Sequence, residues 1–266
     1  MKHIKFLNQK KYIKINKIFN QTGYVKLKLF NKNDLDILKK KIKKKLNAIL
    51  KKNKIKFKIN SIENYHKLAG DKEIHTLLMN PDTRYIILDK KIKNKIFSRL
   101  EKFIELLWGH KNVNFAWIGE LRNKKQLKVC ATGFRIARPL EKKLKNNDAT
   151  SIHVDKNFGG IINDDNKRLF TIWIPLIGFS KKYTLNISPN SHKKNHSKFL
   201  GISKNKITIS LSKKYTNKFK FFRPNMKYGE VLLLNSNLLH GSSVNLGNKS
   251  RLSLDCRVIN QERFSI

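Results

Sequence analysis

From about residue 114 onwards, apolar residues recur with the period of β-strands, and this feature constrains the possible folds most. Nine short segments bounded by turn-forming residues are predicted as strands: residues 115–118, 127–131, 134–137, 151–154, 169–176, 184–187, 207–211, 230–234 and 251–259. So many short strands without intervening helices are typical of a β-sandwich or jelly roll. We therefore expect residues 114–260 to form a jelly-roll core.

Residues 1–113 are predicted to form a mostly helical flank that packs on this core. After a short extended segment, 23–29, two apolar stripes have helical spacing: Leu35, Leu38, Ile42, Leu46 and Ile49 form the first, and Ile92, Ile96, Leu100, Phe103, Ile104 and Leu107 the second. We expect Asn33 or Asp34 to cap the first helix. Gly109 should end the second helix, which spans residues 90–108.

The length and composition are those of one domain. Of the 266 residues, 39% are hydrophobic and 10% aromatic, which is enough for an apolar core. No repeat or interdomain linker interrupts the pattern. We therefore expect residues 1–266 to be a single, mainly β domain with a helical flank, of the α+β class.

The chain is strongly basic, with 59 Lys and Arg against 18 Asp and Glu and a formal net charge of +41. Such a field attracts polyanions. The lysines are spread from Lys2 to Lys249, however, whereas nucleic-acid-binding proteins gather basic groups on one face or stripe. A coding bias towards Lys, Asn, Ile and Phe explains this dispersion but not the scarcity of acidic residues. Nucleic acid stays open as a partner, and a small molecule is favoured over it.

Cysteine usage and the N-terminus predict a cytoplasmic location. Neither Cys130 nor Cys256 belongs to a motif with disulfide or zinc spacing. The basic N-terminus lacks the unbroken apolar stretch of a signal peptide, and no later segment approaches membrane-spanning length. We expect a protein without a membrane span.

His153 and Asp155 form the strongest local signal for a site, because residues i and i+2 of a strand point to one face and can bind one ion together. A second histidine, His240, follows 87 residues later, after the apolar segment 231–234. A jelly roll can bring such positions together. Two imidazoles and one carboxylate make the facial triad of iron(II) oxygenases, which leaves metal positions open for a bidentate ketoacid and dioxygen.

Arg251, eleven residues after His240, is predicted to anchor a carboxylate near this metal. In the strand that it opens, Arg251, Ser253, Asp255 and Arg257 share one face while apolar residues share the other. One face is therefore predicted as a site and the other as core. A planar guanidinium beside the Ser253 hydroxyl suits the distal carboxylate of 2-oxoglutarate, since arginine can bind it bidentately.

The order His-x-Asp, distal histidine and Arg-x-Ser resembles the phytanoyl-CoA dioxygenase-like branch of the Fe(II)/2-oxoglutarate-dependent oxygenases. Residues 185–193 are similar to the "PGSH" segment of that family, with Asn190 where glycine is usual. The resemblance covers about residues 134–259. Within the family, segments 134–139 and 173–176 resemble oxygenases associated with bacterial carbohydrate or surface-polysaccharide clusters.

The resemblance implies a double-stranded β-helix (cupin-like) core, iron ligation by His153, Asp155 and His240, and 2-oxoglutarate binding by Arg251 with Ser253. It also implies dioxygen as a cosubstrate, release of succinate and CO2, and oxidation of a small metabolite, with a sugar or activated sugar as the suggested class. Related halogenases lack the carboxylate. Asp155 therefore favours hydroxylation or another oxidation over halogenation.

Five further residues are candidates around the metal. Thr171 and Trp173 alternate on one face of segment 169–176 and are expected near the cosubstrate, although Trp173 has an equal alternative as an ordinary core aromatic. Arg135 and Arg138 are candidates for an anionic substrate group such as phosphate or carboxylate. Because they lie on opposite strand faces, we do not expect both to bind it. Arg257 is a further candidate for substrate binding.

Two other functions stay open on the sequence. The net charge would suit an oxygenase that acts on a polyanion such as nucleic acid. Alternatively, a jelly-roll protein could hold a metal without turnover. Against this last function, a purely structural metal needs no carboxylate anchor such as Arg251 with Ser253.

Overall fold

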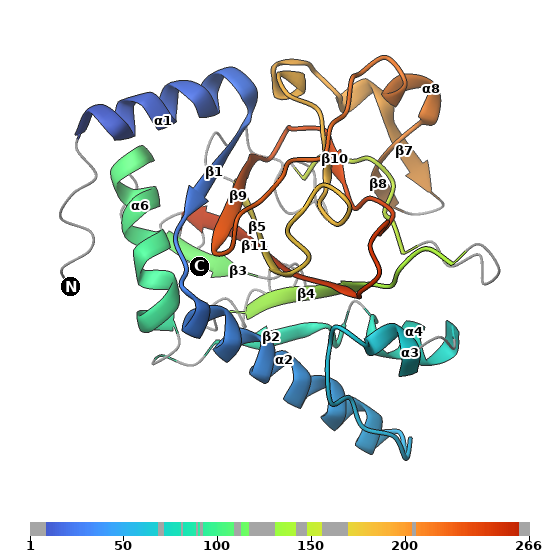
Figure 1. The fold of residues 1–266 in the computed structure, drawn as a ribbon. Helices are drawn as coiled ribbons and strands as arrows, with labels where there is room; N and C mark the ends of the chain where they lie inside the picture. The colour runs from blue at the N-terminus through green and yellow to red at the C-terminus, as the bar shows by residue number, and fades with distance from the viewer. Residues whose placement is uncertain are drawn as a thin grey trace.

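A seven-stranded antiparallel sheet forms the centre of the computed structural model (Figure 1). The structure describes residues 9–68, 72–80, 82–88, 90, 93–108, 113–116, 131–141, 148–155, 170–203 and 206–260. Across the sheet the strands are β1 (Tyr24–Lys28), β9 (Glu230–Asn235), β5 (Phe170–Ile177), β11 (Arg251–Asn260), β4 (Ala131–Ala137) and β2 (Tyr85–Ile87), and β3 (Val113–Ala116) pairs with the last residues of β11. Most neighbouring strands are far apart in the sequence, as in a jelly roll.

The two faces of this sheet differ in chemistry because side chains alternate along each strand. On β11, Leu252, Leu254, Cys256 and Val258 belong to the largest apolar core cluster. The residues between them face the opposite side, where Ser253, Asp255 and Arg257 line a cavity. The division into a core face and a polar face is therefore as the sequence predicted.

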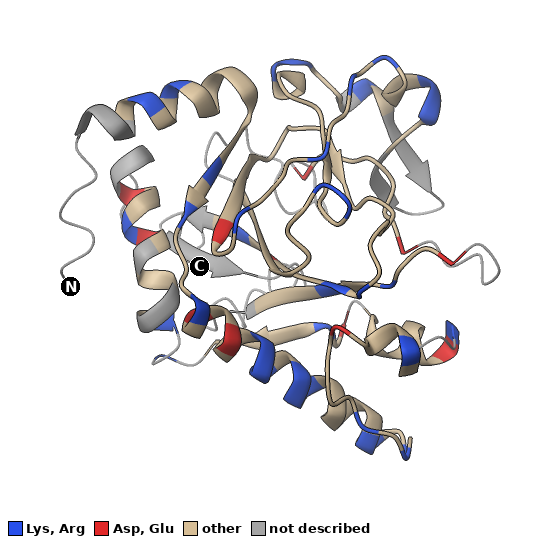
Figure 2. Cartoon of the chain, in the orientation of Figure 1, with Lys and Arg blue, Asp and Glu red and all other residues tan. Residues whose placement is uncertain are grey.

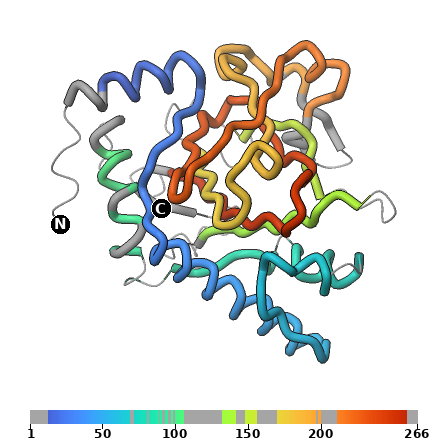
Figure 3. Tube along the Cα trace, viewed as in Figure 1, coloured from blue at the N-terminus to red at the C-terminus, as the bar shows by residue number. Residues whose placement is uncertain are grey.

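Three N-terminal helices cover the apolar face: α1 (Gln9–Thr22), α2 (Lys32–Lys52) and α6 (Ser98–Trp108). Figures 1 and 3 show them along one side of the molecule. On α2, Leu35, Leu38, Ile42 and Leu46 are fully buried in the apolar core as predicted. The next buried residue is Leu50, whereas the predicted Ile49 is only partly buried. The expected jelly-roll core with helices packed on it is confirmed. No helix in the described part of the chain is long and apolar enough to cross a bilayer.

Helix α2 begins earlier than the sequence predicted. Its N-cap is Asn31, whose side chain accepts a hydrogen bond from Asp34 N over 3.0 Å, while Asp34 Oδ2 accepts one from Asn31 N over 3.1 Å. The prediction of Asn33 or Asp34 as the cap was wrong, because Asp34 acts from the third helical position in this reciprocal pair.

The second predicted helix has two parts. A π-helical turn (Lys93–Phe97) precedes α6, which ends at Trp108 as predicted, and Gly109 lies outside the described residues. The short helices α3 (Tyr65–Leu68) and α4 (Lys72–Leu78), like α1 and β2, were not predicted. With three to seven residues, α3, α4 and β2 are too short for a hydrophobic period to be recognised, but this reason does not apply to the 14-residue α1.

A second, less regular layer faces the polar side of the sheet. It contains β6 (Asn186–Ile187) paired with β10 (His240–Gly241), and β7 (Leu200–Ser203) paired with β8 (Lys206–Leu211). Between β6 and β7 the chain forms two 3-10 helices, Ser191–Lys193 and Ser197–Phe199. Helix α8 (Lys213–Thr216) follows β8 and precedes β9 of the main sheet. The predicted strand 151–154 forms one bridge, between His153 and His240. Most of the predicted strand 127–131 lies outside the described residues.

We expect Leu233→Ala to lower the free energy of unfolding by about 2–5 kcal/mol, because it leaves a cavity between the sheet and the helices. Leu233 is 0% exposed on β9. Urea denaturation followed by circular dichroism measures the change. Leu246→Ala is the matched control, since Leu246 is 57% exposed, and its effect should stay below about 0.5 kcal/mol. Equal effects of the two substitutions would contradict this position of the core.

Candidate metal centre

Three side chains from two segments of the second layer converge on one point. His153 and Asp155 lie on the extended segment 151–155, and His240 opens β10. Backbone hydrogen bonds join the segments: His153 N donates to His240 O over 2.9 Å, and His240 N donates to His153 O over 3.1 Å. One ligand atom from each of the three side chains lies within 4.8 Å of the others. The structure thus brings together the three residues that the sequence pattern predicted as ligands.

Both imidazoles turn Nε2 towards the shared centre. Nδ1 of His153 lies 2.8 Å from Ser151 O, and Nδ1 of His240 lies 2.9 Å from Leu238 O. A carbonyl oxygen only accepts, so each Nδ1 carries the proton and each Nε2 keeps its lone pair. The Nε2 atoms of His153 and His240 lie 3.9 and 3.3 Å from carboxylate oxygens of Asp155. Metal-binding histidines are commonly fixed in this tautomer by such a hydrogen bond.

The Asp155 carboxylate is fully buried and is held through both oxygens. Nη2 of Arg257 donates to Oδ1 over 2.7 Å, and the Thr171 hydroxyl donates to Oδ2. Arg257 and Thr171 are cross-strand partners on β11 and β5. The polar face of the main sheet therefore orients a carboxylate that the second layer supplies.

The charges of the cluster favour metal binding. Burial, and next the neighbouring His240, lower the pKa of His153 to about 4. Burial alone would raise the pKa of Asp155, but Arg257 and the two histidines hold it well below its ordinary value. A neutral His153 and an ionised Asp155 are the forms that bind a divalent metal.

The donor set fits a ferrous ion. Two imidazole nitrogens and one carboxylate form the two-histidine, one-carboxylate arrangement, which leaves coordination positions for exchangeable ligands. Structural zinc sites instead use four protein ligands. Within the described ranges, no fourth histidine, cysteine or carboxylate joins His153, Asp155 and His240.

Among the described residues, the hydrogen-bond partners of the buried Arg251 side chain are all neutral. It is 0% exposed; Nη1 donates to Tyr183 O over 2.8 Å and to Ser243 O over 3.3 Å, and Nη2 donates to Ser242 Oγ over 2.6 Å. Among the described residues, Nε has no partner. Burial, followed by the nearby Arg135, lowers the pKa of Arg251 to about 9. Because a buried charge without a counter-ion is unfavourable, the site suits an anionic ligand.

The hydroxyl that contacts Arg251 belongs to Ser242, which the sequence analysis missed. Ser253, which the sequence pattern predicted as the hydroxyl beside Arg251, lines the same cavity as Ser242 but has no hydrogen bond to Arg251. Ser242 stands two residues after His240, at the spacing that places two side chains of an extended segment on one face. This His-x-Ser spacing was the available signal.

A cavity borders the metal cluster on the polar face of the sheet, and we call it the metal cavity. Its walls are formed by Arg135, Thr150, His153, Thr171, Trp173, Leu185, Leu234, His240, Ser242, Ser253, Asp255 and Arg257. Thr171 and Trp173 both lie on this wall, on the face where the sequence placed them. Trp173 also packs in an apolar cluster with Leu185 and Leu234. Thr171 contacts the carboxylate of the metal cluster directly.

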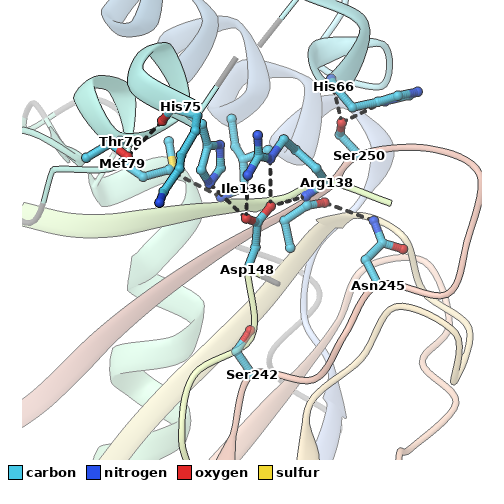
Figure 4. A network of polar contacts seen from close by, with 12 residues as sticks. His66, His75, Thr76, Met79, Ile136, Arg138, Asp148, Ser242, Asn245 and Ser250 are labelled. Atoms are coloured by element: carbon cyan, nitrogen blue, oxygen red, sulfur yellow. Dashed lines mark hydrogen bonds and ion pairs between the residues drawn. The ribbon is translucent and has the colours of Figure 1, made fainter. Parts of the chain in front are cut away.

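The three remaining arginine candidates have different surroundings. Arg138 binds Asp148 with two groups, Nε at 3.1 Å and Nη2 at 3.0 Å (Figure 4). Arg257 binds Asp155. Arg135 lines the metal cavity. Of the three, Arg138 and Arg257 are therefore paired with carboxylates of the chain itself.

Comparison with known proteins identifies a family region and a shared fold. Residues 124–253 match the model of the phytanoyl-CoA dioxygenase (PhyH) family. No curated protein sequence matches the chain. EvdO2 from Micromonospora carbonacea var. aurantiaca is 12% identical, with a TM-score of 0.57 over 98% of this chain and 94% of that chain.

Two further solved structures contain ligands. The epimerase SnoN from nogalamycin biosynthesis, in complex with Fe3+, alpha ketoglutarate and nogalamycin RO, is 11% identical, with a TM-score of 0.53 over 95% of this chain and 85% of that chain. EctD from S. alaskensis, with 2-oxoglutarate and 5-hydroxyectoine, is 15% identical, with a TM-score of 0.54 over 92% of this chain and 74% of that chain. At these identities the likeness establishes the fold.

The family match and the geometry concern the same residues. The matched range, 124–253, contains His153, Asp155 and His240 as well as Arg251. The fold around them is shared with SnoN, crystallised with Fe3+ and alpha ketoglutarate, and with EctD, crystallised with 2-oxoglutarate. Residues 124–253, just under half of the chain, therefore match the phytanoyl-CoA dioxygenase family, and this matched region carries the candidate metal cluster.

Proposed function

We propose that the chain is a dioxygenase that hydroxylates or otherwise oxidises a small metabolite. One juxtaposition carries the proposal: Ser242, which holds the buried Arg251, lines the same cavity as His153 and His240. A protein that kept a metal only for structure would not need, close to that metal, a buried arginine that contacts no carboxylate among the residues that the structure describes. The geometry therefore favours turnover over simple metal storage.

Each residue has a role in this proposal. His153, Asp155 and His240 would hold iron(II), and the Arg251 guanidinium would bind the distal carboxylate of 2-oxoglutarate. Bound iron would supply the oxidation of the substrate by dioxygen, coupled to decarboxylation of 2-oxoglutarate to succinate and CO2. Ser242 orients Arg251 through its hydroxyl. Ser253 is a second hydroxyl in the same wall.

The substrate class that we propose is a sugar or an activated sugar. Its support is the resemblance of segments 134–139 and 173–176 to oxygenases of carbohydrate clusters. These segments lie on β4 and β5, and Arg135 and Trp173 from them line the metal cavity. Aromatic and arginine side chains in one wall suit a ligand with apolar ring faces and anionic or hydroxyl groups.

A polyanionic substrate such as nucleic acid gains no support from the distribution of charge. Figure 2 shows Lys and Arg on α1, α2, α8, β1 and the loops of the second layer. Nucleic-acid surfaces instead gather basic groups in one patch or stripe. We therefore retain a small molecule as the proposed substrate.

We expect His240→Ala to weaken iron(II) binding at least about a hundredfold, because it removes one of three metal ligands. Anaerobic titration of iron(II) with 2-oxoglutarate, followed by the visible charge-transfer band of the metal-bound ketoacid, measures the loss. His66→Ala is the control, since His66 contacts Ser250 and not the metal cluster. Unchanged iron affinity in His153→Ala, Asp155→Ala and His240→Ala alike would rule out this metal site.

We expect Arg251→Gln to raise the 2-oxoglutarate concentration needed for the same band by about tenfold to a hundredfold, because charge-assisted hydrogen bonds to a carboxylate are lost. Iron affinity measured without 2-oxoglutarate should stay the same. Ser242→Ala should have a larger effect than Ser253→Ala, because Ser242 is the serine that contacts Arg251. If Arg251→Gln leaves the 2-oxoglutarate requirement unchanged, the carboxylate is anchored elsewhere.

We expect Arg257→Met to weaken iron(II) binding by about tenfold to a hundredfold, because groups that hold a ligating carboxylate typically contribute that much. The substitution removes the partner at 2.7 Å from Asp155 Oδ1. The same anaerobic titration measures it, with circular dichroism as the check on folding. A folded Arg257→Met variant with unaltered iron affinity would show that Thr171 alone positions the carboxylate.

A further inference from the structure

A second cavity lies at the edge of β4, beyond the point where its pairing with β2 ends. It has a volume of about 430 Å³ and is lined by residues that include His75, Asn80, Arg84, Arg135 and Asp148. We call it the β4-edge cavity. Small-molecule sites commonly have volumes of about 300–1,000 Å³. None of the three metal-cluster residues lines it, so it is separate from the metal cavity.

Arg135 connects the two cavities, because it lines both. On the sheet it stands directly opposite Ser253, which also lines the metal cavity. An anion bound by Arg135 in the β4-edge cavity would therefore lie next to the site of oxidation.

Arg135 is partly buried, and its side chain has no hydrogen-bond or ion-pair partner in the part of the chain that the structure describes. The nearby Asp148 is already held by Arg138, and His75 Nε2 lies 3.3 Å from it (Figure 4). Burial, and next the like charge of Arg84, lower the pKa of Arg135 to about 10. An arginine in these surroundings is stabilised by binding an oxyanion.

The balance of charges around the two cavities favours the binding of such an anion. Among the described residues, five guanidinium groups interact there with three carboxylates: Arg84, Arg135, Arg138, Arg251 and Arg257 with Asp148, Asp155 and Asp255. Two positive charges are thus in excess. Iron(II) and the 2-oxoglutarate dianion would together add no net charge. The excess would still be present when both are bound, and a buried excess charge favours a counter-ion.

We propose that the β4-edge cavity binds the anionic group, a carboxylate or a phosphate, of the substrate, and that Arg135 is the residue that binds it. The cosubstrate does not require Arg135, because Arg251 is the proposed anchor of its distal carboxylate. The assignment of the anion to the substrate rests on the proposed oxygenase function. Binding of the anion itself does not, and is measured without metal.

Calorimetric titration of the metal-free protein with inorganic phosphate, and separately with acetate, tests the proposal at fixed ionic strength. We expect at least one probe to bind, and Arg135→Gln to weaken its binding by about tenfold to a hundredfold. Arg135→Lys, which keeps the charge, should restore part of the affinity. Lys214→Gln is the matched control, because it removes the same charge from an exposed position on α8. The probe that depends more on Arg135 identifies the class of anion.

Three results would overturn the proposal: neither probe binds, Arg135→Gln and Lys214→Gln weaken binding equally, or 2-oxoglutarate displaces the bound probe. The last result would place the anion at the cosubstrate anchor. The charge-transfer band formed by iron and 2-oxoglutarate is recorded in parallel. Failure of that band in the wild-type protein would count against the oxygenase function and leave the anion measurement intact. Arg135→Gln should retain the band, and its loss, as in Arg251→Gln, would assign Arg135 to the cosubstrate.

Discussion

The strict alternation of side chains along β11 is the constraint on which the rest of the structure depends. β11 pairs with β4 and β3 on one side and with β5 on the other, so its register fixes both faces of the sheet. A slip of one residue would turn Leu252 and Leu254 into the metal cavity and Arg251 into the apolar core. The packing of the helices on the apolar face therefore also fixes which side chains point to the metal cavity. The same packing that stabilises the fold positions its chemistry.

The second layer is irregular where the main sheet is regular, and the metal cluster depends on both. Segment 151–155 has little strand pairing of its own, and its position is set by the backbone bridge to His240 and by the bonds of Asp155 to Arg257 and Thr171. Those bonds cross from one layer to the other. A buried carboxylate without them would lose its favourable charge environment. The cluster is therefore held by long-range contacts, and the local conformation of its segment contributes little.

The regular apolar patterns of the main helix and strand were predicted well, whereas a helix cap and some contacts between distant residues were not. The apolar stripe of α2 and the alternation on β11 need only neighbouring residues; both were predicted correctly, except that Leu50 and not Ile49 is the last buried residue of the stripe. The cap of α2 was misplaced, because Asn31 acts through a reciprocal bond with Asp34 that spacing alone does not distinguish from other caps. Ser242 was missed because its contact with Arg251 joins β11 to the residues after β10. Residues 151–154 have the pattern of a strand, yet among the described residues they form one β-bridge, to His240, and one further backbone hydrogen bond, from Leu211 N to Ile152 O.

The arginines illustrate why residue type does not decide role. Arg138 and Arg257 look as suitable for a ligand as Arg135 and Arg251 when only the sequence is considered. The fold separates them by supplying a carboxylate to two of them: Asp148 binds Arg138, and Asp155 binds Arg257. Arg251 instead contacts neutral oxygens, and Arg135 lines two cavities without an ion-pair partner among the described residues. Since buried guanidinium groups favour counter-ions, the arginines that the chain leaves without one are those most suited to bind anions from solution.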